Sequence, residues 1–101
     1  MTNEEFLKQL KIINDSTRLE IIQMLVKNGT MCACKILEEL KITQGTLSHH
    51  MKLMTSAGLV TCKKEGKWCH YTIVKHKIKE IGNFFEGLND ICSINDSCDF
   101  K

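Results

Sequence analysis

Residues 33–57 read ACKILEELKITQGTLSHHMKLMTSA, and this stretch decides the fold. Apolar side chains recur at helical spacing on both sides of residues 41–43. They are Ile36, Leu37, Leu40, Leu47, Met51 and Met54. Residues 41–43 leave room for only a tight connection, and Thr43 is a good N-cap for the helix that follows. The stretch therefore predicts two short helices, over 33–40 and 44–57, joined by a turn.

Three further helices are expected on either side of this stretch. Each of them carries a stripe of apolar residues at helical spacing. They cover residues 3–13, 16–28 and 75–91. The last helix holds more apolar surface than a terminal helix of a small domain can bury alone. A partner helix is therefore expected to cover it, which predicts a dimer.

Two strands of a hairpin are expected over residues 59–64 and 67–74, where apolar and polar residues alternate. Glu65-Gly66 would form a two-residue turn between them. With that turn Cys62 faces Cys69 on the inward, apolar side of the ribbon, and packing is the expected role of this pair. The predicted fold is thus mainly α with a β-hairpin, a winged helix-turn-helix in which residues 44–57 read DNA and the hairpin is the wing.

The length and composition fit one globular domain. Of the 101 residues 43% are hydrophobic and 26% charged, and we expect one domain over residues 1–92 with a polar tail over 93–101. The N-terminal residues do not resemble a secretory signal, and no apolar run is long enough to span a membrane. We therefore expect a cytoplasmic protein, where six cysteines are not a disulfide framework.

Charge is segregated along the chain. Residues 41–79 hold eight lysines and one acidic residue, a local charge of +7, whereas the whole chain carries +2. Lysines gathered in this way release counterions from a phosphate backbone, so the pattern favours double-stranded DNA as a partner over an ordinary solvated surface. Polar groups on helix 44–57 lie opposite its apolar row and suit base edges and phosphates. The residues expected at DNA are Gln44, Gly45, Thr46, Ser48, His49 and Lys52, with Lys63, Lys64 and Lys67 on the wing.

Cys32 and Cys34 form a Cys-x-Cys pair at the start of the helix-turn-helix. Thiolates select soft metals and metalloids, and the N-terminus of a helix favours the thiolate form. Side chains two residues apart point away from each other in a regular helix, so one ion would hold both sulfurs only if the first turn is unwound or becomes so. The pair is the predicted metal site, with Cys92 and Cys98 as possible additional ligands.

Five short motifs together resemble the ArsR/SmtB family of metalloregulatory repressors, over about residues 5–90. They are Ser16-Thr17-Arg18-Leu19, Met31-Cys32-Ala33-Cys34, Ser48-His49-His50-Met51-Lys52, Ala57-Gly58-Leu59-Val60 and Gly66-Lys67-Trp68-Cys69-His70-Tyr71. The resemblance implies a transcriptional repressor that dimerises through its first and last helices and leaves its operator when metal binds. An enzyme is not expected, because Cys-x-Cys is not the redox motif Cys-x-x-Cys and no βαβ pattern surrounds it.

The resemblance also bears on the inducer. Arsenite-sensing members often carry a third cysteine at the position that Leu37 occupies in this chain. We therefore expect trivalent arsenic or antimony as the inducer, either inorganic or as an organoarsenical with only two exchangeable positions, and no organic cofactor. A cadmium, lead or other soft-metal sensor and a thiol redox sensor of the same fold are the alternatives.

Overall fold

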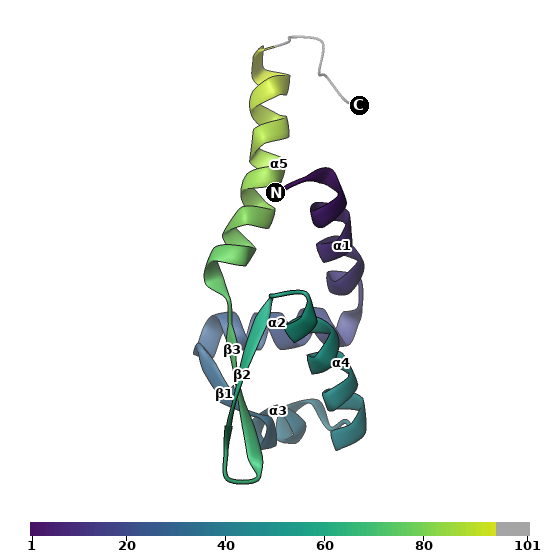
Figure 1. The fold of residues 1–101 in the computed structure, drawn as a ribbon, viewed down its shortest axis with the longest axis vertical. Coiled ribbons are helices and arrows are strands. Elements are labelled where there is room, and N and C mark those ends of the chain that lie inside the picture. Colours follow the sequence, from purple (N-terminus) through teal and green to yellow (C-terminus); the bar gives the residue numbers. More distant parts are fainter. Residues whose placement is uncertain (95–101) are drawn as a thin grey trace.

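The computed structural model describes residues 1–94, with side chains through Leu88. Within this range the chain forms five helices and three strands (Figure 1). They are α1 (Asn3–Ile13), α2 (Ser16–Asn28), β1 (Thr30–Cys32), α3 (Ala33–Leu40), α4 (Gln44–Ser56), β2 (Val60–Glu65), β3 (Trp68–Ile73) and α5 (Lys75–Ile94). The predicted winged helix-turn-helix is confirmed, and α5 continues past its predicted end at residue 91. Residues 95–101 of the predicted polar tail lie outside the described part of the chain.

Side-chain caps explain where the helices begin. Thr2, Asp15 and Thr43 precede α1, α2 and α4, and each side chain accepts a backbone N–H three residues further on. Such caps satisfy N–H groups that have no partner within the helix. Gly29 ends α2 with a φ of +84°, a conformation that a residue with a side chain rarely adopts.

The strand β1 was not predicted from the sequence. It pairs with β3 in an antiparallel arrangement, so the sheet has the order β1-β3-β2. A segment of three residues is too short to show the alternation that identifies a strand. Its pairing places Cys32 opposite His70 and so attaches the start of α3 to the wing.

The predicted register of the hairpin is wrong. Cys62 was expected to face Cys69, but it pairs with Tyr71. β2 continues through Glu65, so the turn begins at Gly66, which has a φ of +63°. The shift by two residues keeps each side chain on its predicted face, because the faces of a strand alternate with a period of two.

The hydrophobic core lies between α2, α3, α4 and the inner face of the sheet. Its largest fully buried side chains are Ile21, Leu25, Ile36, Leu47, Met51, Met54, Leu59 and Val60. The three from α4 are the predicted inner row of that helix. Tyr71 and Ile73 of β3 are also buried here, so the predicted inward face of the hairpin is confirmed for these strand residues.

Helices α1 and α5 lie side by side and extend away from this core (Figure 1). Phe6 of α1 is buried and stacks on Phe84 of α5, with ring centroids 4.0 Å apart. On the same pair of helices Leu7, Phe85 and Leu88 are exposed. Among the described helices none is both long and apolar enough to cross a bilayer.

Candidate thiol site and nucleic-acid interface

Cys32 ends β1 and caps α3, so it lies outside the helix. Its backbone is extended, with φ −67° and ψ 141°, and its Sγ accepts a hydrogen bond from the N–H of Cys34 at 3.3 Å. The two Cα atoms are 5.2 Å apart, and the structure joins the two sulfurs as a disulfide. The pair therefore converges at the junction of β1 and α3, where Cys34 is exposed and Cys32 is half-buried.

This geometry bears on one prediction about the pair. We expected one ion to hold both sulfurs only if the first turn of the helix is unwound or becomes so. The pairing of Cys32 with His70 keeps Cys32 extended, and α3 begins at Ala33 as predicted. Cys32 therefore lies before the first helical turn, and the two sulfurs converge while α3 is formed.

At the junction of β1 and α3 the described residues supply two sulfurs, from Cys32 and Cys34, and no third ligand. No group of three or more His, Cys, Asp or Glu side chains in that part of the chain could hold a metal ion. Leu37 occupies the position where the resemblance would place a third cysteine, and it packs against the core. Of Cys92 only the backbone, within α5, is described, and Cys98 lies beyond the described range. Their predicted role as additional ligands thus stays a prediction.

The residues of α4 that were predicted to contact DNA all lie on its surface. The exposed residues are Gln44, Gly45, Thr46, Ser48, His49 and Lys52. The hydroxyl of Thr43 donates to that of Thr46 at 2.8 Å, so the cap of the helix orients one member of the set. The exposed amide, hydroxyl, imidazole and ammonium groups form a polar surface that suits a major groove.

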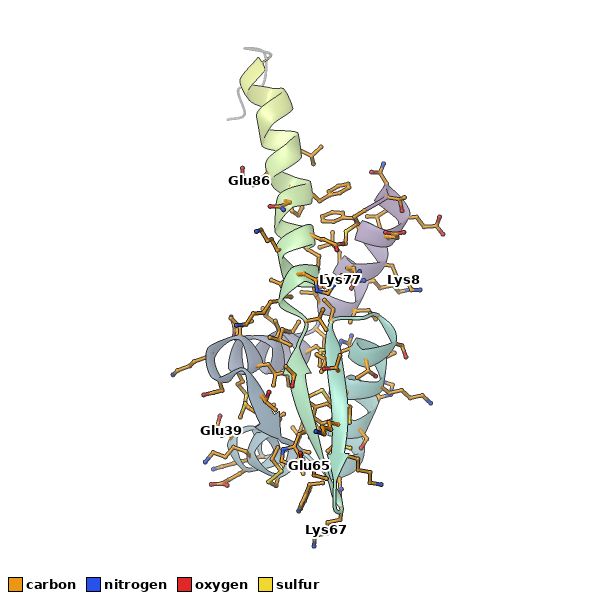
Figure 2. The ribbon with its side chains drawn as sticks, turned by 60° about the vertical axis from the view of Figure 1, so that its left-hand side comes forward. Lys8, Glu39, Glu65, Lys67, Lys77 and Glu86 are labelled. Carbon is orange, nitrogen blue, oxygen red and sulfur yellow. A yellow bond between two sulfur atoms is a disulfide. The ribbon has the colours of Figure 1, made fainter. Side chains whose placement is uncertain are left out.

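The wing carries the other predicted DNA contacts. Lys63, Lys64 and Lys67 are exposed close to the end of the hairpin, and Figure 2 shows Lys67 at its tip. The carboxylate of Glu65 lies 3.8 Å from Nε2 of His70, which can neutralise it when protonated. Because Glu65 is the one acidic residue between positions 41 and 79, the wing tip remains strongly basic. Such a tip suits contacts with the phosphate backbone.

A polar network that was not predicted connects α4 to α1 and α2. Nδ1 of His50 lies 3.1 Å from Nη1 of Arg18, and the Nε of Arg18 donates to the carbonyl of Ile12 at 2.6 Å. Asp15 accepts the backbone N–H of Arg18, and this hydrogen bond is the main cause that lowers the pKa of Asp15. Arg18 and His50 lie in two of the motifs noted above, but their contact depends on the tertiary fold.

The network assigns different roles to two adjacent histidines. A guanidinium can only donate, so Nδ1 of His50 is the acceptor in this contact. His50 is half-buried, whereas His49 is exposed on the polar surface of α4. Adjacent residues on a helix point in different directions, which explains the difference. His50 therefore positions α4, and His49 is free to contact a ligand.

The fold and the basic polar surface together define a winged helix-turn-helix DNA-binding protein. The profile described as "Bacterial regulatory protein, arsR family" matches residues 15–61. An arsenical resistance operon repressor of Staphylococcus aureus is 40% identical over 98 residues, which cover 97% of this chain and 90% of that protein. The chain belongs to the arsR family: it is a DNA-binding transcriptional repressor and not an enzyme.

Other relatives are similar over a smaller part of the chain. An uncharacterized HTH-type transcriptional regulator of Methanocaldococcus jannaschii is 49% identical over 71 residues, 70% of this chain and 80% of that protein. A cadmium resistance regulatory protein homolog of Staphylococcus aureus is 30% identical over 74 residues, 73% and 61% of the two chains. A crystal structure of an ArsR family transcriptional regulator shares the fold, with a TM-score of 0.82, 13% identity and coverage of 92% and 95%.

Replacing His50 with Ala should destabilise the protein, whereas replacing His49 with Ala should not. Loss of the half-buried acceptor leaves Nη1 of Arg18 without this partner and should lower the free energy of unfolding by about 1–3 kcal/mol. The exposed His49 should change it by less than about 0.5 kcal/mol. Urea unfolding of both variants at one protein concentration measures the difference. Equal losses in the two variants would contradict the assigned positioning role of His50.

Proposed function

We propose that this repressor occupies its operator and releases it when trivalent arsenic or antimony binds Cys32 and Cys34. The observation that carries the proposal is the convergence of the two cysteines at the start of α3, with their Cα atoms 5.2 Å apart. The similarity to an arsenical resistance operon repressor over nearly the whole chain supports an arsenic-type inducer. Reduced thiols are the binding form, which fits a cytoplasmic location.

Two thiols suit the chemistry of trivalent arsenic. A thiol condenses with an As–OH group, so that an As–S bond forms and water leaves with the thiol proton. Cys32 and Cys34 can each make one such bond. An organoarsenical with two exchangeable positions is then fully bound, whereas inorganic arsenite keeps one position for Cys92, Cys98 or a small thiol.

The position of the pair provides a route from the thiols to the DNA-reading surface. Sγ of Cys32 caps the N-terminus of α3, so a new bond at this sulfur alters the cap. Ile36 of α3 and Leu47 of α4 are both buried in the same core, which joins the two helices rigidly. Cys32 is also paired with β3 of the wing. A change at the junction is thereby transmitted to both α4 and the wing.

In the DNA complex α4 occupies the major groove and the wing follows the backbone. The exposed polar residues of α4 contact base edges, and Lys63, Lys64 and Lys67 contact phosphates. Two such units, related by a two-fold axis, would read the two halves of an operator.

The dimer forms through the exposed apolar side of α1 and α5. Leu7, Phe85 and Leu88 are 63%, 54% and 50% exposed although they lie beside the buried Phe6. Leaving this much apolar surface in water is unfavourable, and a symmetric partner presents the same surface to cover it.

Two alternatives share this fold and differ in the inducer. The cadmium resistance relative favours a soft metal such as cadmium or lead, which would need sulfurs beyond Cys32 and Cys34. Because the two sulfurs lie close enough to be joined, oxidation of the pair would instead make the protein a thiol redox sensor. The test is release of DNA. If arsenite releases the DNA under reducing conditions, and neither cadmium nor peroxide releases it, both alternatives are excluded.

Replacing Cys32 and Cys34 with Ser should abolish induced release and leave DNA binding intact. The double variant should bind a duplex of the DNA upstream of its own gene within about threefold of the original affinity, since neither thiol contacts DNA. Fluorescence anisotropy with added arsenite or methylarsenite measures the release. A Cys92→Ser/Cys98→Ser variant tests the third ligand and should still respond to methylarsenite. Normal release from the Cys32→Ser/Cys34→Ser variant would contradict the proposal.

Replacing Lys67 with Ala should weaken DNA binding and reduce its dependence on salt. Loss of one phosphate contact lowers the slope of log K against log salt by about 1. Lys8 on α1 is the matched control, because Figure 2 shows it far from the wing tip. Titrations with the same duplex at four salt concentrations measure both slopes. A change in slope for Lys8→Ala, or none for Lys67→Ala, would contradict the placement of DNA.

Replacing Leu88 with Glu should convert the dimer into monomers. The control is Val26→Glu on α2, outside the predicted interface. It adds the same charge at an apolar position of similar exposure, since Leu88 and Val26 are 50% and 52% exposed. Analytical ultracentrifugation gives the mass of each variant. We expect a dimer for the original protein and for Val26→Glu. A monomeric original protein, or a dimeric Leu88→Glu variant, would show that the interface is not formed by α1 and α5.

A further inference from the structure

Cys62 and Cys69 are neighbours on the inward face of the wing. Cys62 is opposite Tyr71, and Cys69 is two residues before Tyr71 on the same strand, so the three side chains share one face. Both cysteines are free thiols. The predicted packing role holds for Cys69, which lies half-buried against the core, but Cys62 is exposed.

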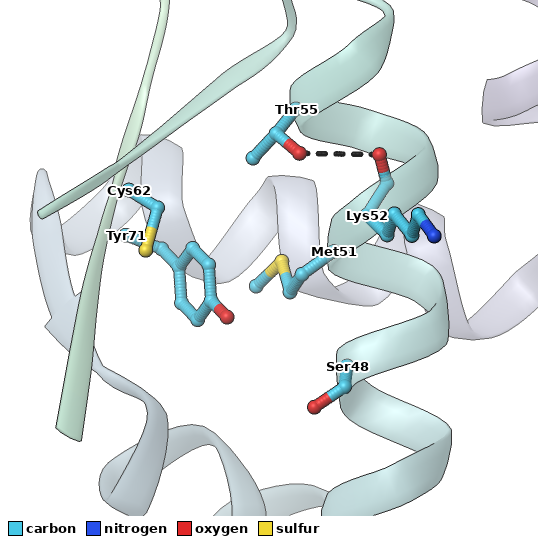
Figure 3. Close-up of a pocket in the computed structure, with 6 residues that line it drawn as sticks. All are labelled: Ser48, Met51, Lys52, Thr55, Cys62 and Tyr71. Atoms are coloured by element: carbon cyan, nitrogen blue, oxygen red, sulfur yellow. Dashed lines mark hydrogen bonds between the residues drawn. The ribbon is translucent and has the colours of Figure 1, made fainter. Parts of the chain in front are cut away.

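An open pocket of about 240 Å³ lies between part of this face and α4, with Cys62 and Tyr71 on the side of the wing (Figure 3). Its walls are Ser48, Met51, Lys52, Thr55, Cys62 and Tyr71. Figure 3 shows the sulfur of Cys62 beside the ring of Tyr71, with the thioether of Met51 across from it. One end of the cavity therefore carries a thiol, and the aromatic ring and thioether provide an apolar surface beside it.

The surroundings of Cys62 and Tyr71 favour the protonated form of each group. Burial, followed by hydrogen bonding and charge repulsion with Cys69, raises the pKa of Cys62. Burial and the two cysteines likewise raise the pKa of Tyr71. Protonated thiols are poor nucleophiles towards alkylating agents and disulfides.

We propose that Cys62 and Cys69 form a second dithiol site, which binds a monoalkyl or monoaryl trivalent arsenical. The arsenic atom has two exchangeable positions, one for each thiol, and its organic group occupies the cavity beside Tyr71 and Met51. This site is separate from Cys32 and Cys34 and needs neither of them. It goes beyond the proposed function, because it adds a ligand position between the DNA-reading helix and the wing.

The binding step is a condensation without oxidation or reduction. Two As–OH bonds of the arsenical break and two As–S bonds form. The two hydroxyl groups leave as water with the protons of Cys62 and Cys69, and arsenic remains trivalent. No partner other than the arsenical is required.

The test uses a full-length Cys32→Ser/Cys34→Ser/Cys92→Ser/Cys98→Ser variant, in which Cys62 and Cys69 are the remaining cysteines. Phenylarsonous acid is the probe. We expect native mass spectrometry to show one phenylarsenic group per chain and thiol titration to show the loss of both thiols. Replacing Cys69 with Ser in this background should lower the affinity by about 100-fold or more, because chelation is lost.

A matched control moves one thiol to the opposite face of β2. The Cys62→Ser/Lys63→Cys change in the same background keeps two thiols but turns one away from the cavity. It should also lose about 100-fold in affinity, and circular dichroism checks that each variant is folded. Equal binding by this control, or no adduct on the Cys62/Cys69 protein, would overturn the proposal. Because no readout involves DNA or Cys32, the result is independent of the proposed release mechanism.

Discussion

The antiparallel pairing of β1 with β3 is the constraint on which the rest of the structure depends. The paired segment is short, and a hydrogen bond between the hydroxyls of Thr30 and Thr72 at 2.8 Å reinforces the pairing. The pairing buries Met31 and leaves Cys32 at the end of the strand, where it caps α3. The start of the helix-turn-helix and the wing are thereby held to each other. Without this pairing the two thiols would not have a defined relation to the DNA-reading surface.

Polar contacts hold α4 at its other side. His50 contacts Arg18 at the start of α2, and Nε2 of the buried Gln9 on α1 donates to the carbonyl of Ala57 at 2.8 Å. These contacts connect α4 to α2 and to α1, and α1 carries part of the proposed dimer interface. Partly buried polar contacts of this kind specify one orientation more strictly than apolar packing does. The orientation of α4 relative to α1 and α2 is therefore set by a few identified residues.

Much of the architecture could be predicted from the sequence because its signals are local. Apolar residues at helical spacing and caps such as Asp15 and Thr43 identified the helices with nearly correct boundaries. The hairpin was also predicted, but its register was wrong. A two-residue turn fits equally well at Glu65-Gly66 or at Gly66-Lys67, and both turns bury the same face of the hairpin. The alternation pattern alone does not distinguish them.

The features that were missed depend on contacts between distant residues. β1 becomes a strand because β3 provides a partner, and the convergence of Cys32 and Cys34 follows from that pairing. The contact of Arg18 with His50 joins residues 32 positions apart. The exposed polar set on α4 was predicted because it follows from the apolar row on the opposite side of the same helix. Spacing along the chain therefore singled out the Cys-x-Cys pair but did not predict its geometry.

The central claim is that the junction of β1 and α3 lets both thiols bind one metalloid without unwinding α3. Amide hydrogen exchange, measured with and without saturating arsenite and with binding verified by mass, tests this claim most directly. Protection of the amides of Leu37 to Leu40 should stay within about threefold, while the amide of Cys34 and those of β1 change. A fall in α3 protection of about tenfold or more would show that the helix unwinds, and would contradict the account.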